Sequence, residues 1–302
     1  MSAPAFVGPA LAAPALDIPR LHIGDWFEAA VEWIKNNLGP ILDAISYIAH
    51  FLNDNLAAGL HAVPPIILAV ILALLAWAAG TWKLGVGSII GLLIIQSMNM
   101  WSSAMDTLAL VIVSTVVALV IGMPTGVLAA RSATVAQAVR PVLDFMQTLP
   151  VFVYLVPTVV IWGIGIVPGM AATVIFAIPP GVRLTQLGIQ QVDKEMVEAG
   201  RAFGARPRDI LMGIQMPLAM PTIMAGVNQV IMLALSMVVV AGMVGAGGLG
   251  SDVYQGLTTL DVPLAFEAGL AVVILAMFLD RITAGVGSRS AVARANRRTA
   301  AR

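Results

Sequence analysis

The sequence contains no cysteine and only three histidines, and it lacks a phosphate-binding loop of the form GxxxxGK[ST]. Without cysteine the chain can form no disulfide, no thiolate metal site and no cysteine nucleophile. The histidines, His22, His50 and His61, all precede the first long apolar run, so a buried histidine-based catalytic or metal centre is not expected. Because the phosphate-binding loop is missing, any ATP that the protein uses must be bound by a partner.

Charged residues are also scarce. They make up 11% of the chain, against 59% hydrophobic residues, and the mean hydropathy is +0.95. Soluble domains are roughly half apolar and about a quarter charged, so we predict an integral membrane protein. The apolar runs are continuous and lack the alternation of barrel strands, which predicts an all-α polytopic fold.

The long apolar runs predict the number of membrane spans. A hydrocarbon core about 30 Å thick calls for roughly 20 apolar residues per helix, and the chain offers seven candidates. They cover residues 63–82, 84–100, 108–130, 149–166, 168–184, 218–244 and 263–279. The fourth and fifth contain Pro150, Pro157, Pro179 and Pro180. Prolines kink or break helices, which is tolerated at membrane depth where protein or water satisfies the freed backbone groups.

Two different regions precede the first span. Residues 1–19 are rich in alanine and proline and lack a basic segment before their apolar residues, so we expect a flexible tail and not a signal peptide. In residues 25–52 apolar side chains recur at helical spacing, which predicts an amphipathic helix broken near Gly39 and Pro40. Its polar face is acidic and does not suit anionic lipid, so we expect this helix to pack on protein.

Apart from Arg20 and Lys35 near the N-terminus, where acidic residues outnumber them, basic residues are confined to alternate loops. They follow spans one, three, five and seven: Lys83; Arg131 and Arg140; Arg183, Lys194, Arg201, Arg206 and Arg208; and Arg281, Arg289, Arg294, Arg297, Arg298 and Arg302. The opposite loops contain only Asp106, Asp252 and Asp261 as charged residues. The positive-inside rule therefore predicts an outside N-terminus and a cytoplasmic C-terminus, and this consistency favours seven spans over six.

Residues 192–217, VDKEMVEAGRAFGARPRDILMGIQMP, concentrate charge between the fifth and sixth spans. Residues 194–203 can form a short helix that ends at Gly204, a natural C-cap. Pro207 suits the first position of a second helix leading into the sixth span. One interpretation is a rigid helix–turn–helix knob on the surface; the other is an ordinary solvated loop whose basic residues hold the orientation.

The spacing in this loop resembles the EAA loop of ABC importer permeases. The positions that match in register are Glu198, Ala199, Gly204, Ile214 and Pro217. Gly200 stands where the family has a third alanine, which should weaken the short helix by about 1 kcal/mol, and Met216 stands for a leucine. In that family the loop is a coupling helix seated in a cleft of the cytoplasmic ATPase. The resemblance implies this role for Glu198, Ala199, Gly200, Arg201, Gly204, Ile214 and Pro217.

Longer stretches look like the permease of the glycine betaine/proline betaine (ProU-type) uptake systems. They are LDFMQTLPVFVYLVP (143–157), FAIPPGVRLT (176–185), PLAMPTIMAGVNQVIMLALSMVVVAGMVGAGGLG (217–250) and LDRIT (279–283). The resemblance covers about residues 60–285 and implies the ABC type I importer permease fold. It also implies a bacterial inner-membrane homodimer that works by alternating access with two cytoplasmic ATPases, which use ATP and Mg²⁺, and an extracytoplasmic substrate-binding protein.

The same resemblance implies how the chain is divided and what it does not bind. We expect an extracytoplasmic tail and amphipathic helix in residues 1–60, a transmembrane permease domain in 61–284, and a basic cytoplasmic tail in 285–302. No cofactor or metal of its own, no nucleic acid and no catalytic residue are expected for a transporter subunit.

Polar residues inside the spans are candidates for a solute path. Asn228, Gln229 and Ser236 lie in the sixth span, directly after the charged loop. Intramembrane amides also join helices, at about 0.6 kcal/mol each, and this interpretation stays open for Asn228 and Gln229. Gln96 and Asn99 lie at the end of the second span, and Glu267 lies near an outer end, where exposure to water explains it.

Two further patterns are weak. Gly245 to Gly250, GAGGLG, satisfies G-x-G-x-x-G, but it follows a membrane helix instead of a strand, so we interpret it as a flexible extracytoplasmic turn and not as a dinucleotide site. Trp101, Tyr154 and Trp162 could hold a quaternary ammonium by cation–π contact. An interfacial belt has the same composition, so we assign no aromatic cage.

Other functions are weighed against the osmolyte permease. An ABC permease for choline, carnitine or methionine would share the loop and the spans. An ion-coupled secondary transporter or a channel would need charged residues at mid-membrane, which the predicted spans lack. A membrane enzyme is disfavoured because no paired acids, histidine cluster or activated nucleophile is present.

Overall fold

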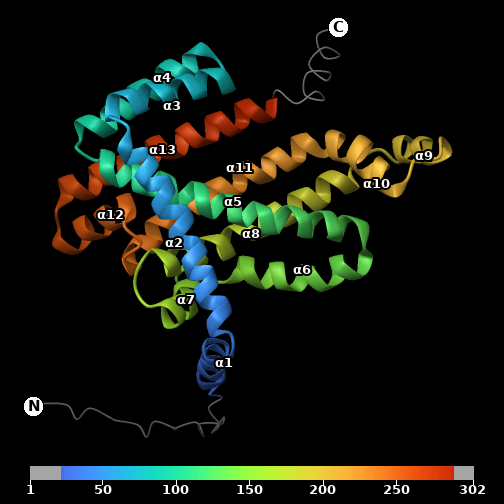
Figure 1. Cartoon of the computed structure of the whole chain (residues 1–302), viewed down its shortest axis with the longest axis horizontal. Coiled ribbons are helices and arrows are strands. Elements are labelled where there is room, and N and C mark those ends of the chain that lie inside the picture. Colours follow the sequence, from blue (N-terminus) through green and yellow to red (C-terminus); the bar gives the residue numbers. More distant parts are fainter. Residues whose placement is uncertain (1–21, 289–302) are drawn as a thin grey trace, which may run out of the picture.

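The computed structural model describes residues 22–288, and all regular structure in that range is helical (Figure 1). The helices are α1 (Ile23–Asn37), α2 (Gly39–Ala62), α3 (Pro65–Ala79), α4 (Trp82–Ser97), α5 (Trp101–Arg131), α6 (Ala133–Thr148), η1 (Val151–Tyr154), α7 (Leu155–Trp162), α8 (Ile166–Gln190), α9 (Lys194–Ala202), α10 (Pro207–Ile210), η2 (Leu211–Gln215), α11 (Met216–Ala241), η3 (Gly242–Val244), α12 (Gly248–Thr259) and α13 (Val262–Ser288). The predicted tail of residues 1–19 and the basic residues from Arg289 onward lie outside the described residues.

The number of candidate membrane spans roughly fits the sequence prediction. Four are long, continuous and apolar: α5, α8, α13 and the 38-residue run Pro207–Val244 that contains α11. Two bent pairs add one span each when the pair is counted together: α2 with α3, at 109°, and α6 with the segment Val151–Trp162, at 114°. α4 is a shorter apolar helix. The all-α fold is confirmed, and the four to six candidate spans of the described residues roughly fit the predicted seven. The predicted fourth span, residues 149–166, instead forms η1 and the eight-residue α7.

The effects of the prolines differ from the prediction in the fifth span. Pro150 does stand at a bend, between α6 and η1, but α8 runs through Pro179 and Pro180 without a break. α8 packs against both α5 and α11, and this packing outweighs the roughly 3 kcal/mol that proline costs inside a helix. α8 also continues to Gln190, so Arg183 lies inside a helix and not in a loop as predicted.

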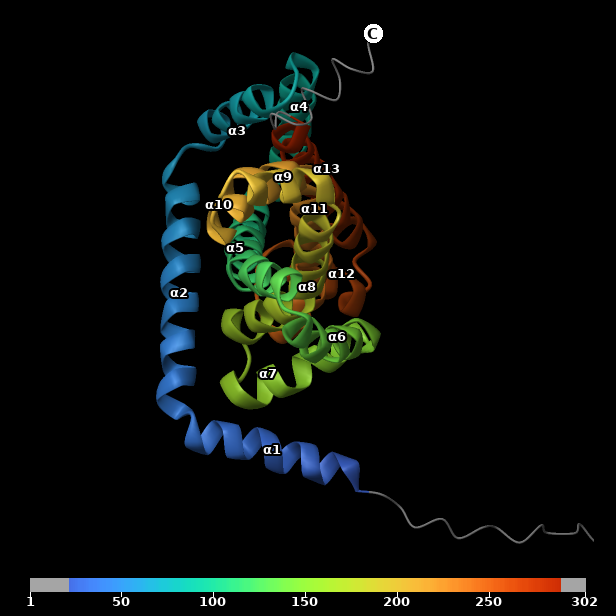
Figure 2. The same ribbon diagram turned by 90° about the vertical axis from the view of Figure 1, so that its right-hand side faces the viewer.

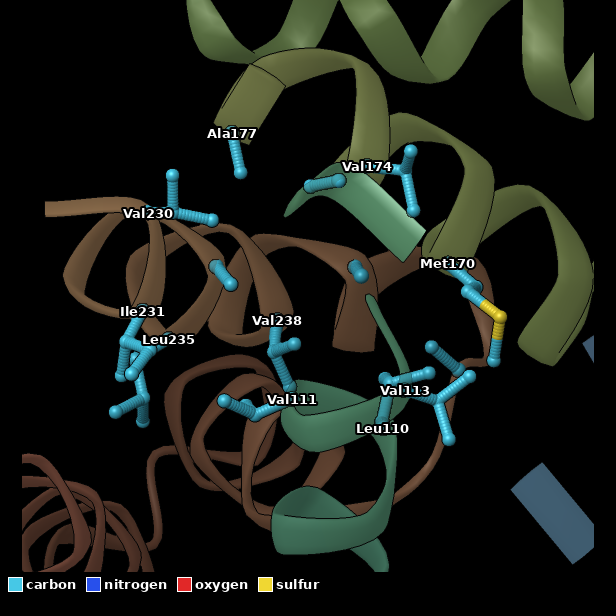
Figure 3. Packing of buried hydrophobic residues seen from close by; sticks show 14 of the residues in the cluster. Leu110, Val111, Val113, Met170, Val174, Ala177, Val230, Ile231, Leu235 and Val238 are labelled. Carbon is cyan, nitrogen blue, oxygen red and sulfur yellow. The ribbon is translucent and has the colours of Figure 1, made fainter. Parts of the chain in front are cut away.

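The core lies where α5, α8 and α11 meet. Figure 3 shows aliphatic side chains of the three helices pointing into one buried cluster. Its members include Leu110, Val111, Val113, Met170, Val174, Ala177, Val230, Ile231, Leu235 and Val238. Moving an apolar side chain from lipid into the protein core yields no hydrophobic free energy, because lipid tails are equally apolar. The stability of this cluster therefore comes from dense van der Waals packing.

Small residues bring the three core helices close together. A Cβ atom on Gly126 of α5 would lie 2.6 Å from the carbonyl oxygen of Val182 on α8, and one on Gly226 of α11 would lie 2.9 Å from Cβ of Leu184. Gly122 precedes Gly126 by four residues and faces the same helix. This is the small-residue spacing with which membrane helices pack backbone to backbone.

α3 and α4 form a short antiparallel pair that packs on α13 (Figure 1). They contain 15 and 16 residues. Their contact is close because Gly85 leaves room for Trp77: a Cβ atom on Gly85 would lie 2.9 Å from Cβ of Trp77. The turn between them meets α13 at Gly285, where a Cβ atom would lie 2.6 Å from the carbonyl oxygen of Ala79.

The predicted amphipathic region forms α1 and α2, and the break falls at Leu38, beside the predicted Gly39 and Pro40. Figure 2 shows α2 along one side of the bundle, with α1 turned across its base. α2 packs on α5 and α8, and the indole N–H of Trp162 on α7 donates to the carbonyl of Leu42 at 3.2 Å. The expected packing on protein is confirmed for α2, whereas α1 leaves Trp26 69% exposed.

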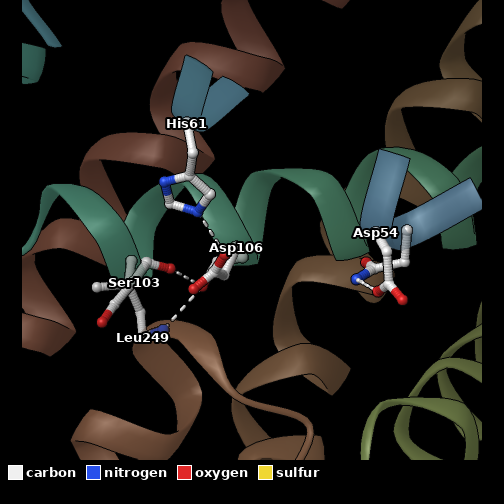
Figure 4. Close-up of polar contacts among 7 residues, drawn as sticks. Asp54, His61, Ser103, Asp106 and Leu249 are labelled. Atoms are coloured by element: carbon white, nitrogen blue, oxygen red, sulfur yellow. Dashed lines mark hydrogen bonds and ion pairs between the residues drawn. The ribbon is translucent and has the colours of Figure 1, made fainter. Parts of the chain in front are cut away.

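A polar contact fastens the end of α2 to the start of α5. His61 Nε2 lies 2.7 Å from Asp106 Oδ1 (Figure 4). At the next residue of α5, the hydroxyl of Thr107 donates to the carbonyl of Ser103 at 2.7 Å and accepts the N–H of Leu249 at 2.8 Å. Asp106, predicted to lie in a loop, is thus part of α5, and Thr107 satisfies a free donor in the first turn of α12.

The glycine turn before α12 is rigidly packed and not flexible as predicted. Gly245, Gly247 and Gly248 have φ angles of +80°, +80° and +65°, which only glycine adopts readily. A Cβ atom on Gly248 would overlap the Thr107 hydroxyl, and one on Gly242 would overlap the backbone of Gly250. The glycines therefore allow backbone segments of this turn to pass close to α5 and to each other.

Candidate functional site

The charged loop folds as a knob that begins directly after α8. Asp193 is the N-cap of α9, and its carboxylate accepts the backbone N–H of Glu195 at 2.9 Å. Such a cap stabilises a helix by about 1 kcal/mol. The nine residues of α9 include no buried one. Glu198, Ala199 and Arg201 are exposed, so they are available to a partner.

α9 ends where the sequence predicts. Gly204 has a φ of +76°, its N–H donates to the carbonyl of Arg201 at 2.9 Å, and the N–H of Ala205 donates to the carbonyl of Gly200 at 3.0 Å. A Cβ atom at Gly204 would meet nothing within 4 Å. Glycine is needed here for its backbone conformation and not for space.

The second half of the knob leads straight into a core helix. Pro207 occupies the first turn of α10, as predicted. α10 passes through the π-helical turn Leu211–Gln215 into α11, so Pro207–Val244 is one helical run. Pro217 lies in the first turn of α11 and is exposed. Because the run is continuous, displacement of α10 moves α11 with it.

Gly200 is the position at which the two halves of the knob touch. A Cβ atom on Gly200 would lie 2.8 Å from Cδ1 of Ile214 and 3.5 Å from Cγ1 of Ile210. Gly200 and Ile214 therefore face each other, whereas Glu198 and Ala199 are exposed. The seven predicted residues divide into an exposed group and a group that holds the knob together.

The knob lies at one end of the molecule. In Figure 1 α9 and α10 extend beyond the ends of α5 and α6, and Figure 2 looks onto them along the core helices. A cavity of about 280 Å³ separates α9 from the ends of α5 and α8. Its polar lining includes Gln190, Lys194, Glu198, Arg201 and Gln215. We call this the α9 end, and the opposite one the α12 end.

The structure separates the three predicted solute-path residues. Asn228 faces α13: its amide N–H donates to Asp280 Oδ1 at 2.8 Å, and its carbonyl accepts the hydroxyl of Thr283 at 3.1 Å. Gln229 and Ser236 are exposed on another face of α11, seven residues apart. Residues with that spacing share one side of a helix. Asn228 thus joins helices, while the other two line an open surface.

Sequence reasoning missed two charged groups. Asp280 was left outside the predicted seventh span, although it follows Leu279 directly and lies well inside α13. Arg183 was assigned to a loop, although it forms an ion pair with Asp144 of α6. Arg183 already lies within the predicted span 168–184, and Asp280 lies one residue beyond the span 263–279. A search for partners of charges in and next to the spans would have singled out both, because intramembrane charges generally have a partner.

The remaining polar and aromatic candidates have structural surroundings. Trp101 and Tyr154 are buried in two different hydrophobic clusters, so they form neither a cage nor an interfacial belt. Gln96 and Asn99 are exposed at the turn between α4 and α5. Within residues 22–288 no group of three or more His, Cys, Asp and Glu side chains could hold a metal ion.

Comparison with known proteins decides the family. Residues 122–291, more than half of the chain, match the family described as "Binding-protein-dependent transport system inner membrane component". The chain belongs to this family. As a member, the permease is a transport subunit and not an enzyme, and the ATPase of such an importer is a separate subunit. The knob at the α9 end is the part that resembled the coupling loop of this family.

Two relatives match nearly the whole permease. It is 45% identical to the glycine betaine/proline betaine transport system permease protein ProW of Escherichia coli (strain K12), over 91% of this chain and 78% of that protein. It is 46% identical to the glycine betaine transport system permease protein OpuAB of Bacillus subtilis (strain 168), over 89% of this chain and 95% of that protein.

A solved structure confirms the fold. The MetNI methionine ABC transporter, in an inward-facing conformation, contains a chain that superposes with a TM-score of 0.53 at 27% identity. The match covers 63% of the permease and 92% of that chain. The permease therefore has the fold of an ABC importer permease, and about a third of its length lies outside the shared part.

Proposed function

We propose that the permease carries glycine betaine, proline betaine and related osmolytes inward, by alternating access in an ATP-driven importer. The observation that carries this proposal is the identity of 45–46% with permeases named for glycine betaine transport. The match to the methionine transporter chain is weaker, at 27%. That difference favours a betaine over methionine as the solute.

The knob at the α9 end is the proposed contact with the ATPase. Glu198, Ala199 and Arg201 present the exposed side of α9, and Gly200 packs on Ile214 behind it. Closure of two ATPases on ATP and Mg²⁺ would push α9, and the continuous run from Pro207 would pass that push to α11. The permease would need a second copy of itself to form a complete path.

The orientation follows from the same arrangement. We place the α9 end and the C-terminus in the cytoplasm of a bacterium, and the N-terminus outside, facing the substrate-binding protein. Residues 1–60 would then be extracytoplasmic, 61–284 the permease domain and 285–302 a cytoplasmic tail. Since the chain has no cysteine, Ala202→Cys introduces a single label site. A membrane-impermeant maleimide should modify it only in inverted vesicles; modification in intact cells would reverse the orientation.

The solute path is proposed along the exposed side of α11. Gln229 and Ser236 lie on that side, whereas the hydrogen bonds of Asn228 to Asp280 support helix packing. Gln229→Ala should therefore lower uptake with a normal amount of protein in the membrane, and Asn228→Ala should lower both together. If instead Asn228→Ala lowered uptake at a normal amount of protein and Gln229→Ala lowered both, the solute path would lie at the contact between α11 and α13.

The function is tested by uptake of labelled glycine betaine. Osmolyte-transport-deficient cells would express the permease with its ATPase and binding-protein subunits, as wild type, Gly204→Asp or Gly204→Asn. Both variants keep a residue that tolerates the left-handed conformation, but only aspartate adds a charge on the exposed knob. We expect Gly204→Asn to retain most of the uptake and Gly204→Asp to lose nearly all of it at equal membrane levels.

Each part of the proposal can fail separately in this experiment. Uptake that persists in Gly204→Asp would remove the knob from coupling. No uptake by wild type, with the ATPase still bound to the permease, would keep the importer and discard betaines as its solute.

A further inference from the structure

An ion pair joins α6 to α8 in the half of the molecule nearest the knob. Arg183 Nη2 donates to Asp144 Oδ1. Arg183 lies seven residues before Gln190, the last residue of α8, or about 10 Å along the helix axis. The side chains of Arg183 and Asp144 are 40% and 56% exposed, so a solute can reach them, and a charge within a candidate span generally marks a solute path or a functional pair.

The pair borders a polar groove. A cavity of about 380 Å³ lies between α6 and α8, a size typical of small-molecule sites. Its lining includes Gln137, Arg140, Arg183, Gln186 and Gln190. Gln190 also lines the cavity beside α9. Through this shared residue the groove lies next to the cavity at the α9 end.

The charges of the groove are unequal. Arg140 stands one helical turn before Asp144 on α6, yet among residues 22–288 it forms no ion pair, because the partner of Asp144 is Arg183. Arg140 and Arg183 thus line the groove with two guanidinium groups, and Asp144, which is not part of the lining, adds one carboxylate through its ion pair with Arg183. Guanidinium binds a carboxylate with two parallel hydrogen bonds, so the groove can accept one further carboxylate beside the pair that it already has.

This set of charges matches a zwitterion. A solute with one carboxylate and one quaternary ammonium can replace the internal pair: its carboxylate takes Arg183 and Arg140, and its cation lies against Asp144. Every charge then keeps a partner. A cation without a carboxylate would leave both guanidinium groups unpaired, and a simple anion would leave Asp144 unpaired.

We propose that the α6–α8 groove is a transient binding site for the zwitterionic solute, with Arg183 and Arg140 for the carboxylate and Asp144 for the quaternary ammonium. The proposal rests on the proposed betaine transport. It makes the Arg183–Asp144 pair the bond that the solute opens on its way to the α9 end, and it places this site on α8, the helix that leads directly into α9.

The test uses the complete importer, with its ATPase and binding-protein subunits, reconstituted in proteoliposomes. Labelled glycine betaine is supplied at a concentration below that which saturates the binding protein. The variants are Arg183→Gln, Asp144→Asn and the double variant. Arg131→Gln, which removes a positive charge from the end of α5 outside the groove, is the matched control. We expect each single variant to lower the initial uptake rate by about tenfold or more, and the control to stay within about twofold.

The double variant separates a solute site from a simple tie between helices. Glutamine and asparagine can still hydrogen-bond across α6 and α8, and no charge is left unpaired, so a tie would recover most of the lost uptake. A solute site loses both of its recognition groups and stays at least as impaired as either single variant. Recovery in the double variant, or uptake within twofold of wild type in both single variants, would overturn the proposal.

Assembly and solute identity have their own controls. The amount of ATPase that copurifies with a variant shows whether that variant is assembled. If Arg183→Gln does not assemble, the uptake rate of Asp144→Asn alone tests the proposal. Failure of wild type to take up glycine betaine would overturn the proposed function, and the site with it. Normal wild-type uptake with unaffected variants would overturn the site alone.

Discussion

The two ends of the permease place glycine in opposite surroundings. At the α9 end, Gly204 has a φ of +76° and open space around it, so that a Cβ atom would meet nothing within 4 Å. At the α12 end, Gly242 lies so close to Gly250 and Ser251 that a Cβ atom would overlap their backbone. One end uses glycine to turn the chain, and the other uses it to lock two helices together.

This difference suits the two ends to different tasks. A turn that is held by its own backbone hydrogen bonds and is surrounded by solvent can be covered by a partner without repacking the permease. A turn whose backbone is in contact on several sides moves only with the helices that it joins. Substitution of glycine at the two ends should therefore change the stability and the uptake of the permease by unequal amounts.

The largest effect is expected for Gly242→Ala at the α12 end. The added methyl group has no space because the neighbouring atoms belong to the backbone of α12, so α11 and α12 must separate. We expect a loss of about 3 kcal/mol or more in the free energy of unfolding, measured as a lower melting temperature in detergent and less protein in the membrane. Gly87→Ala, with nothing within 4 Å, is the control.

If Gly242→Ala had the same melting temperature as Gly87→Ala, the backbone at the α12 end could adjust to a methyl group. The α12 end would then not be more tightly packed than the α9 end.

A smaller effect is expected for Gly204→Ala at the α9 end. Alanine fits the space but disfavours the left-handed conformation by roughly 1–2 kcal/mol. The strain falls on the knob alone, so the melting temperature of the permease should stay near that of wild type, while uptake falls several-fold. A large drop in melting temperature would mean that the knob is part of the core.

The smallest effect is expected for Gly200→Ala, which restores the alanine of the EAA pattern. Alanine strengthens α9 by about 1 kcal/mol, and the atom that it would meet first, Cδ1 of Ile214, is the end of a flexible side chain. The gain in helix stability offsets the cost of moving the Ile214 side chain, so the stability and the uptake of the permease should change little. A loss comparable to that of Gly204→Ala would show that the Gly200–Ile214 contact has no room to adjust.

Much of this architecture can be predicted from local patterns. The helix of residues 194–203, its end at Gly204 and the start of the next helix at Pro207 follow from capping preferences and proline geometry, which act within a few residues. The break beside Pro40 has the same origin. These features depend on the backbone near each residue, so the sequence around them is sufficient.

Features that depend on distant contacts could not be predicted in the same way. Nothing near Pro179 and Pro180 in the sequence shows that α5 and α11 will hold α8 straight. Arg183 and Asp144 are 39 residues apart, and their meeting depends on how α6 folds back along α8. The rigidity of the glycine turn depends likewise on Thr107, a residue of another helix that supplies its hydrogen bond.

The short pair α3 and α4 has a consequence for the lipid around the permease. At 15 and 16 residues, each is only about 23 Å long, whereas a hydrocarbon core is about 30 Å thick. Trp82 and Lys83, exposed at the turn between them, are side chains that reach toward an interface. A span this short is accommodated by local thinning of the bilayer, by flanking side chains that reach the interface or by association with a further subunit, and the cost of the mismatch rises with acyl-chain length.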